Sequence, residues 1–135
     1  VEINPDTAHP IVAMMDAQKE ILAKGNYGGT MRLGAYEERV KPGTIAHAAY
    51  GTDVVEERHR HRYEINPAYV KQIEDAGLVF SGTSPDGVLM EIAELPTDVH
   101  PFFLGTQAHP ELLARPLDPH PLFSAFLRAA KDRAA

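Results

Sequence analysis

A helix with clear start and stop signals lies in the middle of the chain, and strand-like segments surround it. Residues 67–76 follow Asn66, a favourable N-cap, begin with Pro67, which suits a first helical position, and end before Gly77. An apolar stripe at helical spacing consists of Tyr69, Val70, Ile73 and Ala76. The segment therefore predicts a short amphipathic helix.

Strand-like and helical segments alternate along the rest of the chain. Strands are predicted over residues 30–37, 54–65, 78–81, 88–95 and 102–107, with glycine- and proline-containing turns between them. Helices are predicted over residues 16–24, 44–50 and 119–131, the last with Leu122, Phe123, Phe126, Leu127 and Ala130 on one face. Residues 11–15 fit either a strand or a helix. This mixture over 135 residues predicts a single unit of the α/β class.

Composition excludes several classes of protein. The chain has no cysteine, which rules out disulfides and cysteine-ligated zinc within it. No apolar run approaches the ~18 residues of a membrane helix, and no leader peptide precedes the first segment. A net charge of −6 argues against general nucleic-acid binding. We predict a cytoplasmic protein with neither membrane nor nucleic acid as partner.

His109 and Glu111 are the candidate catalytic residues. They follow the apolar segment 102–106 directly, and in an extended chain residues two apart point to the same side. Pro110 favours an extended His109. The carboxylate would then orient an imidazole that acts as base for a nucleophile, which would be a thiol from outside this chain. The alternative is an ordinary surface loop.

Residues 57–64 (ERHRHRYE) form a second unusual segment. In an extended conformation one face carries Arg58, Arg60 and Arg62, and the other carries His59, His61 and Tyr63. The segment fits a solvated edge strand, a site for an anionic ligand, or a basic patch for nucleic acid. His59 and His61 fit a shared metal, but no further ligand is evident in the sequence, so no metal ligand is predicted.

Taken together, four motifs resemble the glutaminase domain of the CTP synthase family. They are residues 28–34 (GGTMRLG), 57–64 (ERHRHRYE), 105–111 (GTQAHPE) and 115–123 (RPLDPHPLF). The His-Pro-Glu element is shared by class I glutamine amidotransferases in general. The resemblance implies an α/β, flavodoxin-like class I glutamine amidotransferase domain, of which residues 1–135 form a C-terminal portion.

The resemblance also implies a reaction. Such domains release ammonia from L-glutamine, and a separate synthetase domain uses it in the ATP-dependent amination of UTP to CTP. Mg²⁺ serves the ATP step and GTP activates the glutaminase, so no cofactor is expected on this chain itself. The parent enzyme is expected to be a homotetramer, with the synthetase domain and the rest of the glutaminase domain as partners.

Four residues match functional positions of the family. His109 and Glu111 would complete the catalytic triad, while Glu2 and Arg62 would contact L-glutamine. The nucleophilic cysteine and the oxyanion loop are expected before Val1, so we expect the chain alone to be inactive. The alternative is a free-standing, non-catalytic, glutaminase-like module that binds a ligand or a partner.

Overall fold

The computed structural model describes residues 4, 6–14 and 31–134. Its strands are β1 (Val12–Ala13), β2 (Arg32–Val40), β3 (Val54–His61), β4 (Glu64–Ile65), β5 (Val79–Thr83), β6 (Met90–Glu94) and β7 (Leu104–Thr106). Its helices are α2 (Ile45–Tyr50), α3 (Pro67–Asp75), the 3₁₀ helix η2 (Pro110–Leu112) and α4 (Pro121–Ala134). The helix predicted over residues 16–24 lies outside the described residues.

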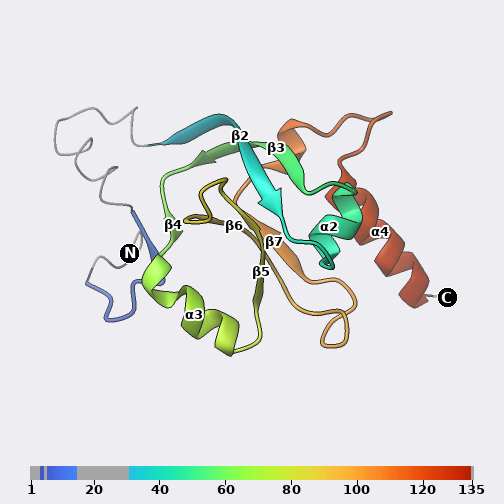
Figure 1. The fold of residues 1–135 in the computed structure, drawn as a ribbon. Coiled ribbons are helices and arrows are strands. Elements are labelled where there is room, and N and C mark those ends of the chain that lie inside the picture. The colour runs from blue at the N-terminus through green and yellow to red at the C-terminus, as the bar shows by residue number, and fades with distance from the viewer. Residues whose placement is uncertain (1–3, 5, 15–30, 135) are drawn as a thin grey trace.

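A five-stranded sheet organises this part of the chain, in the order β3-β2-β5-β6-β7, and β1 pairs with β4 separately. Helix α3 lies near β4, whereas α2 and α4 lie together at the opposite end of the sheet (Figure 1). The predicted mixture of strands and helices is confirmed. Every strand pairing in the described residues is antiparallel, so the parallel strands typical of a flavodoxin-like sheet are not found in this portion.

Helices α2 and α3 begin and end close to where local signals predicted, whereas α4 runs over Pro121–Ala134 instead of residues 119–131. The Asn66 side chain accepts a hydrogen bond from the Ala68 backbone N–H at 3.0 Å and caps α3. Gly77 follows α3 at a φ of 102°, a conformation that glycine adopts without steric cost. Thr44 caps α2 in the same way, accepting from the His47 N–H at 3.1 Å.

Across the residues that the structure describes, no helix has both the length and the apolar character needed to cross a membrane.

Two predicted strands differ from the observed ones. The extended run predicted over residues 54–65 breaks after His61, and the chain resumes as β4, whose Ile65 pairs with Val12 of β1. That pairing makes part of the ambiguous segment 11–15 a strand. The strand predicted over residues 102–107 is shorter and less buried than expected, with Phe103 50% exposed. It is the edge of the sheet and has a neighbour on one side only.

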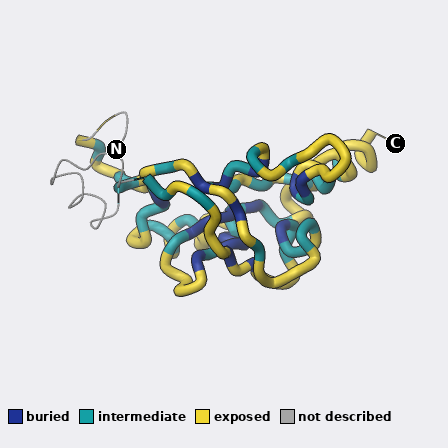
Figure 2. Tube along the Cα trace, turned by 90° about the horizontal axis from the view of Figure 1, so that it is seen from above, coloured by how far each residue is buried: buried dark blue, intermediate teal, exposed yellow. Residues whose placement is uncertain are grey.

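The apolar core sits beneath the middle of the sheet. Ile92 of β6 is 1% exposed and packs with Val40 and Ala46. A β-carbon at Gly82, on the paired strand β5, would lie 2.6 Å from Cγ1 of Ile92, so this close approach requires glycine. In Figure 2 the buried segments lie mainly in the interior of the described part of the chain, and exposed segments form its outer loops.

Helix α4 buries less of its apolar face than its sequence suggested. Leu122 is 5% exposed, but Phe123, Phe126 and Leu127 are 42%, 53% and 65% exposed. The Phe126 ring contacts the ring of Phe102 at 5.7 Å between centroids. The apolar face predicted for this helix is therefore present, but in this portion of the protein most of it points outward.

Candidate active site

The His109 and Glu111 side chains meet at the end of β7. Nδ1 of His109 lies 2.7 Å from Oε1 of Glu111. The expected extended segment is wrong in detail, because Glu111 lies in η2 and His109 precedes it as N-cap. Pro110 fits the first position of η2, so the 3₁₀ turn, rather than an extended chain, brings the two side chains together.

The backbone holds this pair against the sheet. The His109 N–H donates to the Arg58 carbonyl of β3 at 2.8 Å, and the Ala108 N–H donates to Oγ1 of Thr106 at 3.0 Å. Because β3 pairs with β2 along its whole length, the backbone of His109 is attached to one of the most extensively hydrogen-bonded strands of the sheet. This attachment restricts the position of His109.

Electrostatics favour one tautomer of His109. The hydrogen bond from His109 lowers the pKa of Glu111, and the charge of Arg60 adds to the effect, so Glu111 is a carboxylate near neutral pH. An ionised carboxylate only accepts, so Nδ1 of neutral His109 carries the hydrogen and Nε2 carries the lone pair. The His109 side chain is 36% exposed. The pair can therefore accept a proton from an approaching nucleophile.

Arg62 lies at the break between β3 and β4. It lines a cavity of about 400 Å³ together with Val12, Tyr63 and Gln107. His109 is not among the lining residues, although Gln107 is two positions before it in the chain. The structure thus joins His109 to Glu111 and puts Arg62 on a neighbouring cavity. Glu2 lies outside the described residues.

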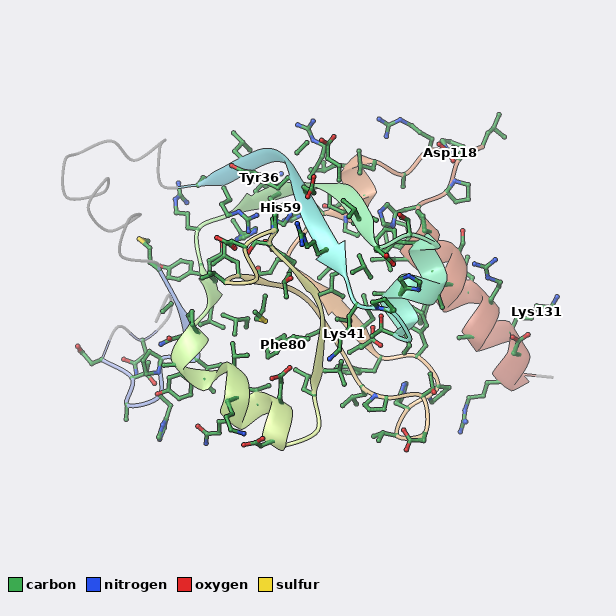
Figure 3. All side chains as sticks on the ribbon, viewed as in Figure 1. Tyr36, Lys41, His59, Phe80, Asp118 and Lys131 are labelled. Carbon is green, nitrogen blue, oxygen red and sulfur yellow. The ribbon has the colours of Figure 1, made fainter. Side chains whose placement is uncertain are left out.

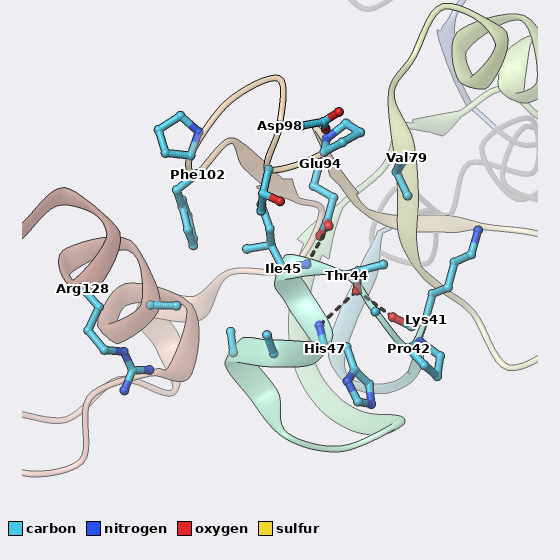
Figure 4. A pocket seen from close by; sticks show the side chains of 17 residues that line it. Lys41, Pro42, Thr44, Ile45, His47, Val79, Glu94, Asp98, Phe102 and Arg128 are labelled. Carbon is cyan, nitrogen blue, oxygen red and sulfur yellow. Dashed lines mark hydrogen bonds between the residues drawn. The ribbon is translucent and has the colours of Figure 1, made fainter. Parts of the chain in front are cut away.

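A larger cavity lies elsewhere in the described portion. It measures about 990 Å³, and Lys41, Glu94 and Phe102 are among its lining residues (Figure 4). None of the residues predicted from sequence lines it. Its buried carboxylate, Glu94, accepts hydrogen bonds from the N–H groups of Ile45 and Ala46 at 2.7 and 3.0 Å. Glu94 therefore satisfies the first backbone donors of α2, which is a structural role.

Sequence reasoning missed a buried polar network between β3 and β6. Arg32 donates to Oε1 of Glu91 at 2.6 Å, and His59 Nε2 lies 2.9 Å from Oε1 of Glu38. Tyr36 lies edge-on to His59, with ring centroids 5.5 Å apart (Figure 3). The other members are Tyr50, Glu57, His61, Glu64 and His120. The sequence signal for this network was the period-two pattern of residues 57–61. In a strand this pattern puts Glu57, His59 and His61 on the face opposite the exposed arginines.

Burial shifts the protonation of this network. It raises the pKa of Glu38, with the charge of Glu57 adding to it, to about 7, and it raises the pKa of Glu64 to about 7 despite the nearby Arg32. Burial, followed by the charge of His59, lowers the pKa of His61 to about 4. One oxygen of each glutamate in this network, Oε2 of Glu38, Glu57, Glu64 and Glu91, has no hydrogen-bond partner.

Glu64→Gln should change how the stability of the chain depends on pH. Between about pH 4.5 and 7 folded Glu64 holds more protons than unfolded Glu64, so its contribution to stability falls as pH rises. Glutamine does not titrate. As the pH rises from 5 to 8, the unfolding free energy of the variant should therefore increase by on the order of 2 kcal/mol relative to that of the parent. Urea unfolding with a chelator present measures this, with the exposed Asp75→Asn as control. A pH-independent difference for Glu64→Gln would contradict it.

Comparisons with known proteins identify the family of the chain. Residues 11–129 match the family described as Glutamine amidotransferase class-I. The chain is 59% identical over 132 residues to the CTP synthase of Leifsonia xyli subsp. xyli, and 56% identical over 133 residues to that of a Nocardioides species. These matches cover 98% of this chain and 23% of each relative, so the chain spans about a quarter of the relatives' length.

A solved structure has the same fold. The Trypanosoma brucei CTPS glutaminase domain with bound acivicin aligns at a TM-score of 0.81 and 36% identity. The alignment covers 96% of this chain and 49% of that one. The resemblance inferred from the four motifs, to the glutaminase domain of CTP synthases, is confirmed. The chain belongs to the class I glutamine amidotransferase family.

Proposed function

We propose that this chain is the portion of a CTP synthase glutaminase domain that supplies the base for L-glutamine hydrolysis. The observation that carries the proposal is the 2.7 Å contact between Nδ1 of His109 and Oε1 of Glu111, anchored on β3. Similarity to CTP synthases over 98% of the chain supports the choice of substrate class. The full reaction belongs to the longer protein, of which such a chain would be about a quarter.

His109 would move protons at Nε2 in both halves of the reaction. It first accepts the proton of a cysteine thiol from outside this chain, as sulfur bonds to the amide carbon of glutamine. It returns that proton to the leaving nitrogen, so that the carbon–nitrogen bond breaks and ammonia departs. It then takes a proton from the water that cleaves the thioester to glutamate, and the thiol recovers that proton. Glu111 stays ionised and stabilises the imidazolium formed at each stage.

Arg62 and Glu2 would bind the substrate. Arg62 lines the cavity beside Gln107, where a planar guanidinium suits a carboxylate of glutamine. Glu2 would hold the α-amino group. Since Arg62 lies two residues before β4 and directly follows β3, the end of β3 would position it relative to His109.

The remaining parts of the reaction are assigned to the longer protein. The ammonia would serve the ATP-dependent amination of UTP to CTP in a synthetase domain, with Mg²⁺ and ATP bound there and GTP as activator. We propose a cytoplasmic homotetramer for that enzyme. No residue of this chain is assigned to ATP, Mg²⁺ or GTP.

An isotope experiment tests the function. The full-length protein is incubated with UTP, ATP, Mg²⁺, GTP and L-glutamine labelled with ¹⁵N in its side-chain amide. The expected product is CTP that carries the label at its exocyclic amine, detected by mass spectrometry. Unlabelled ammonium chloride in place of glutamine should also give CTP. Failure of both nitrogen sources would contradict the proposal and favour a non-catalytic, glutaminase-like binding module.

A further inference from the structure

Two histidines and a glutamate converge in the buried network, and none of them belongs to the His109–Glu111 pair. His59 and His61 come from β3, and Glu91 comes from β6. One donor atom of each residue lies within 4.8 Å of the other two. His59 and Glu91 are each 1% exposed. These residue types are ligands of divalent transition metals, and their arrangement depends on strands that are distant in the sequence.

The outer contacts of the two imidazoles direct their inner nitrogens toward each other. Nδ1 of His61 lies 3.1 Å from the Tyr63 carbonyl, which only accepts, so this nitrogen carries a hydrogen. Nε2 of His59 lies 2.9 Å from Oε1 of Glu38, so the outer nitrogen of each ring has a polar partner outside the pair. The inner atoms, Nδ1 of His59 and Nε2 of His61, are only 2.8 Å apart. A hydrogen shared by the two rings or a metal ion bound by both can occupy this position, and the experiment below separates the two.

The outer contacts are also those that orient metal-binding histidines. Such histidines commonly donate their second ring N–H to a carboxylate or a backbone carbonyl, which holds the ring and its tautomer. Glu38 is that carboxylate for His59, and Tyr63 supplies that carbonyl for His61. The supporting groups of a metal site are thus already in place.

Glu91 offers the third donor. Its Oε1 accepts from Arg32 at 2.6 Å, while its buried Oε2 has no hydrogen-bond partner and lies 3.9 Å from Nδ1 of His59. A buried carboxylate oxygen without a partner is costly unless a cation satisfies it. The ion pair with Arg32 fixes the carboxylate so that this oxygen faces the histidines.

Charge and access favour a divalent ion in this position. Four buried glutamates, at positions 38, 57, 64 and 91, share the network with the guanidinium of Arg32, so carboxyl groups outnumber the guanidinium in it. The His61 side chain is 13% exposed and lines the cavity of about 400 Å³. An ion about 2 Å from each donor requires only small side-chain rotations, and water from the cavity can serve as a fourth ligand.

We propose that Nδ1 of His59, Nε2 of His61 and Oε2 of Glu91 bind one zinc-type divalent transition-metal ion. The ion ties β3, the strand that supports His109, to β6. This site is independent of the proposed glutaminase chemistry, because it does not include His109, Glu111 or Arg62. Sequence analysis predicted no metal ligand because Glu91 is thirty positions from His61 and only the fold brings them together.

Zinc binding by the full-length protein tests the site. The protein is stripped with a chelator, dialysed against micromolar zinc chloride and assayed for zinc per chain by mass spectrometry. His61→Asn and Glu91→Gln should each weaken the binding of one zinc at least about tenfold relative to the parent. The control is His47→Asn, because His47 forms a surface pair with Asp53 at 2.8 Å and belongs to no three-residue metal-binding group among the described residues. It should bind zinc as the parent does.

The outcomes separate a metal from a proton. Cobalt substitution gives a direct readout on the unmodified protein, since a site with two imidazoles and a carboxylate should show tetrahedral Co²⁺ absorption that His61→Asn removes. Circular dichroism shows whether each variant is folded. If Glu91→Gln is unfolded, zinc binding by His61→Asn alone tests the proposal. Equal zinc binding by the parent and a folded His61→Asn, or no zinc on the parent, overturns the proposal. The gap between the rings then holds only a proton.

Discussion

His109→Ala in the full-length protein is expected to lower glutamine-dependent CTP formation by at least about 10³-fold. The variant loses the base that accepts the thiol proton and returns it to the leaving nitrogen. CTP formation from ammonium chloride should stay within about twofold of the parent, because free ammonia does not require the triad. Steady-state rates with each nitrogen source measure the effect. Equal losses with both sources would mean that His109 supports folding or the synthetase step.

Two further variants sharpen this result. Glu111→Gln retains an acceptor for Nδ1 of His109 but removes the charge that stabilises the imidazolium, so a smaller loss, on the order of 10²-fold, is expected with glutamine. His47→Ala removes another histidine–carboxylate pair, His47 with Asp53, from the surface. It should leave both rates unchanged. A comparable loss in His47→Ala would show that the assay does not report on the active site.

Ile92→Ala is expected to be the most destabilising of the substitutions considered, by about 2–5 kcal/mol in unfolding free energy. Ile92 is 1% exposed, packs against Val40 and Ala46, and covers Gly82 so closely that no other side chain fits beneath it. Truncation leaves a cavity that the paired strands β5 and β7 hold open. Urea unfolding of the chain, followed by circular dichroism, measures the loss.

Ile92→Val and Leu127→Ala provide the scale for that measurement. Ile92→Val removes one methyl group and should cost about 0.5–1.5 kcal/mol. Leu127 is 65% exposed, so Leu127→Ala should change the unfolding free energy by no more than about 0.5 kcal/mol. If Ile92→Ala cost no more than Leu127→Ala, the core would not be centred on β6.

Local signals predicted the helices well because each depends on a few neighbouring residues. Asn66, Pro67 and Gly77 specified both ends of α3, and α2 ends at Tyr50, the last residue of its predicted range. The strands were less predictable. Whether residues 102–107 lie at the centre or the edge of a sheet depends on which strands flank them, and the chain break after His61 depends on pairing with β1.

The same distinction applies to the site. His109 and Glu111 were predicted together because they are two positions apart, and either an extended chain or the observed 3₁₀ turn lets them meet. Arg62 was singled out by its motif, and the structure adds the cavity that it lines. The roles of these residues in catalysis and binding stay predictions.

The sequence by itself determined the helix ends, the alternation of faces in β3 and the family to which the chain belongs. These depend on short-range stereochemistry and on motifs that are contiguous in the chain. Only the tertiary structure decided that Arg32, His59 and Glu91 share one buried network, because burial and pKa shifts arise when distant strands exclude water together. The outward apolar face of α4 is likewise a property of packing, since periodicity defines a face but not its partner.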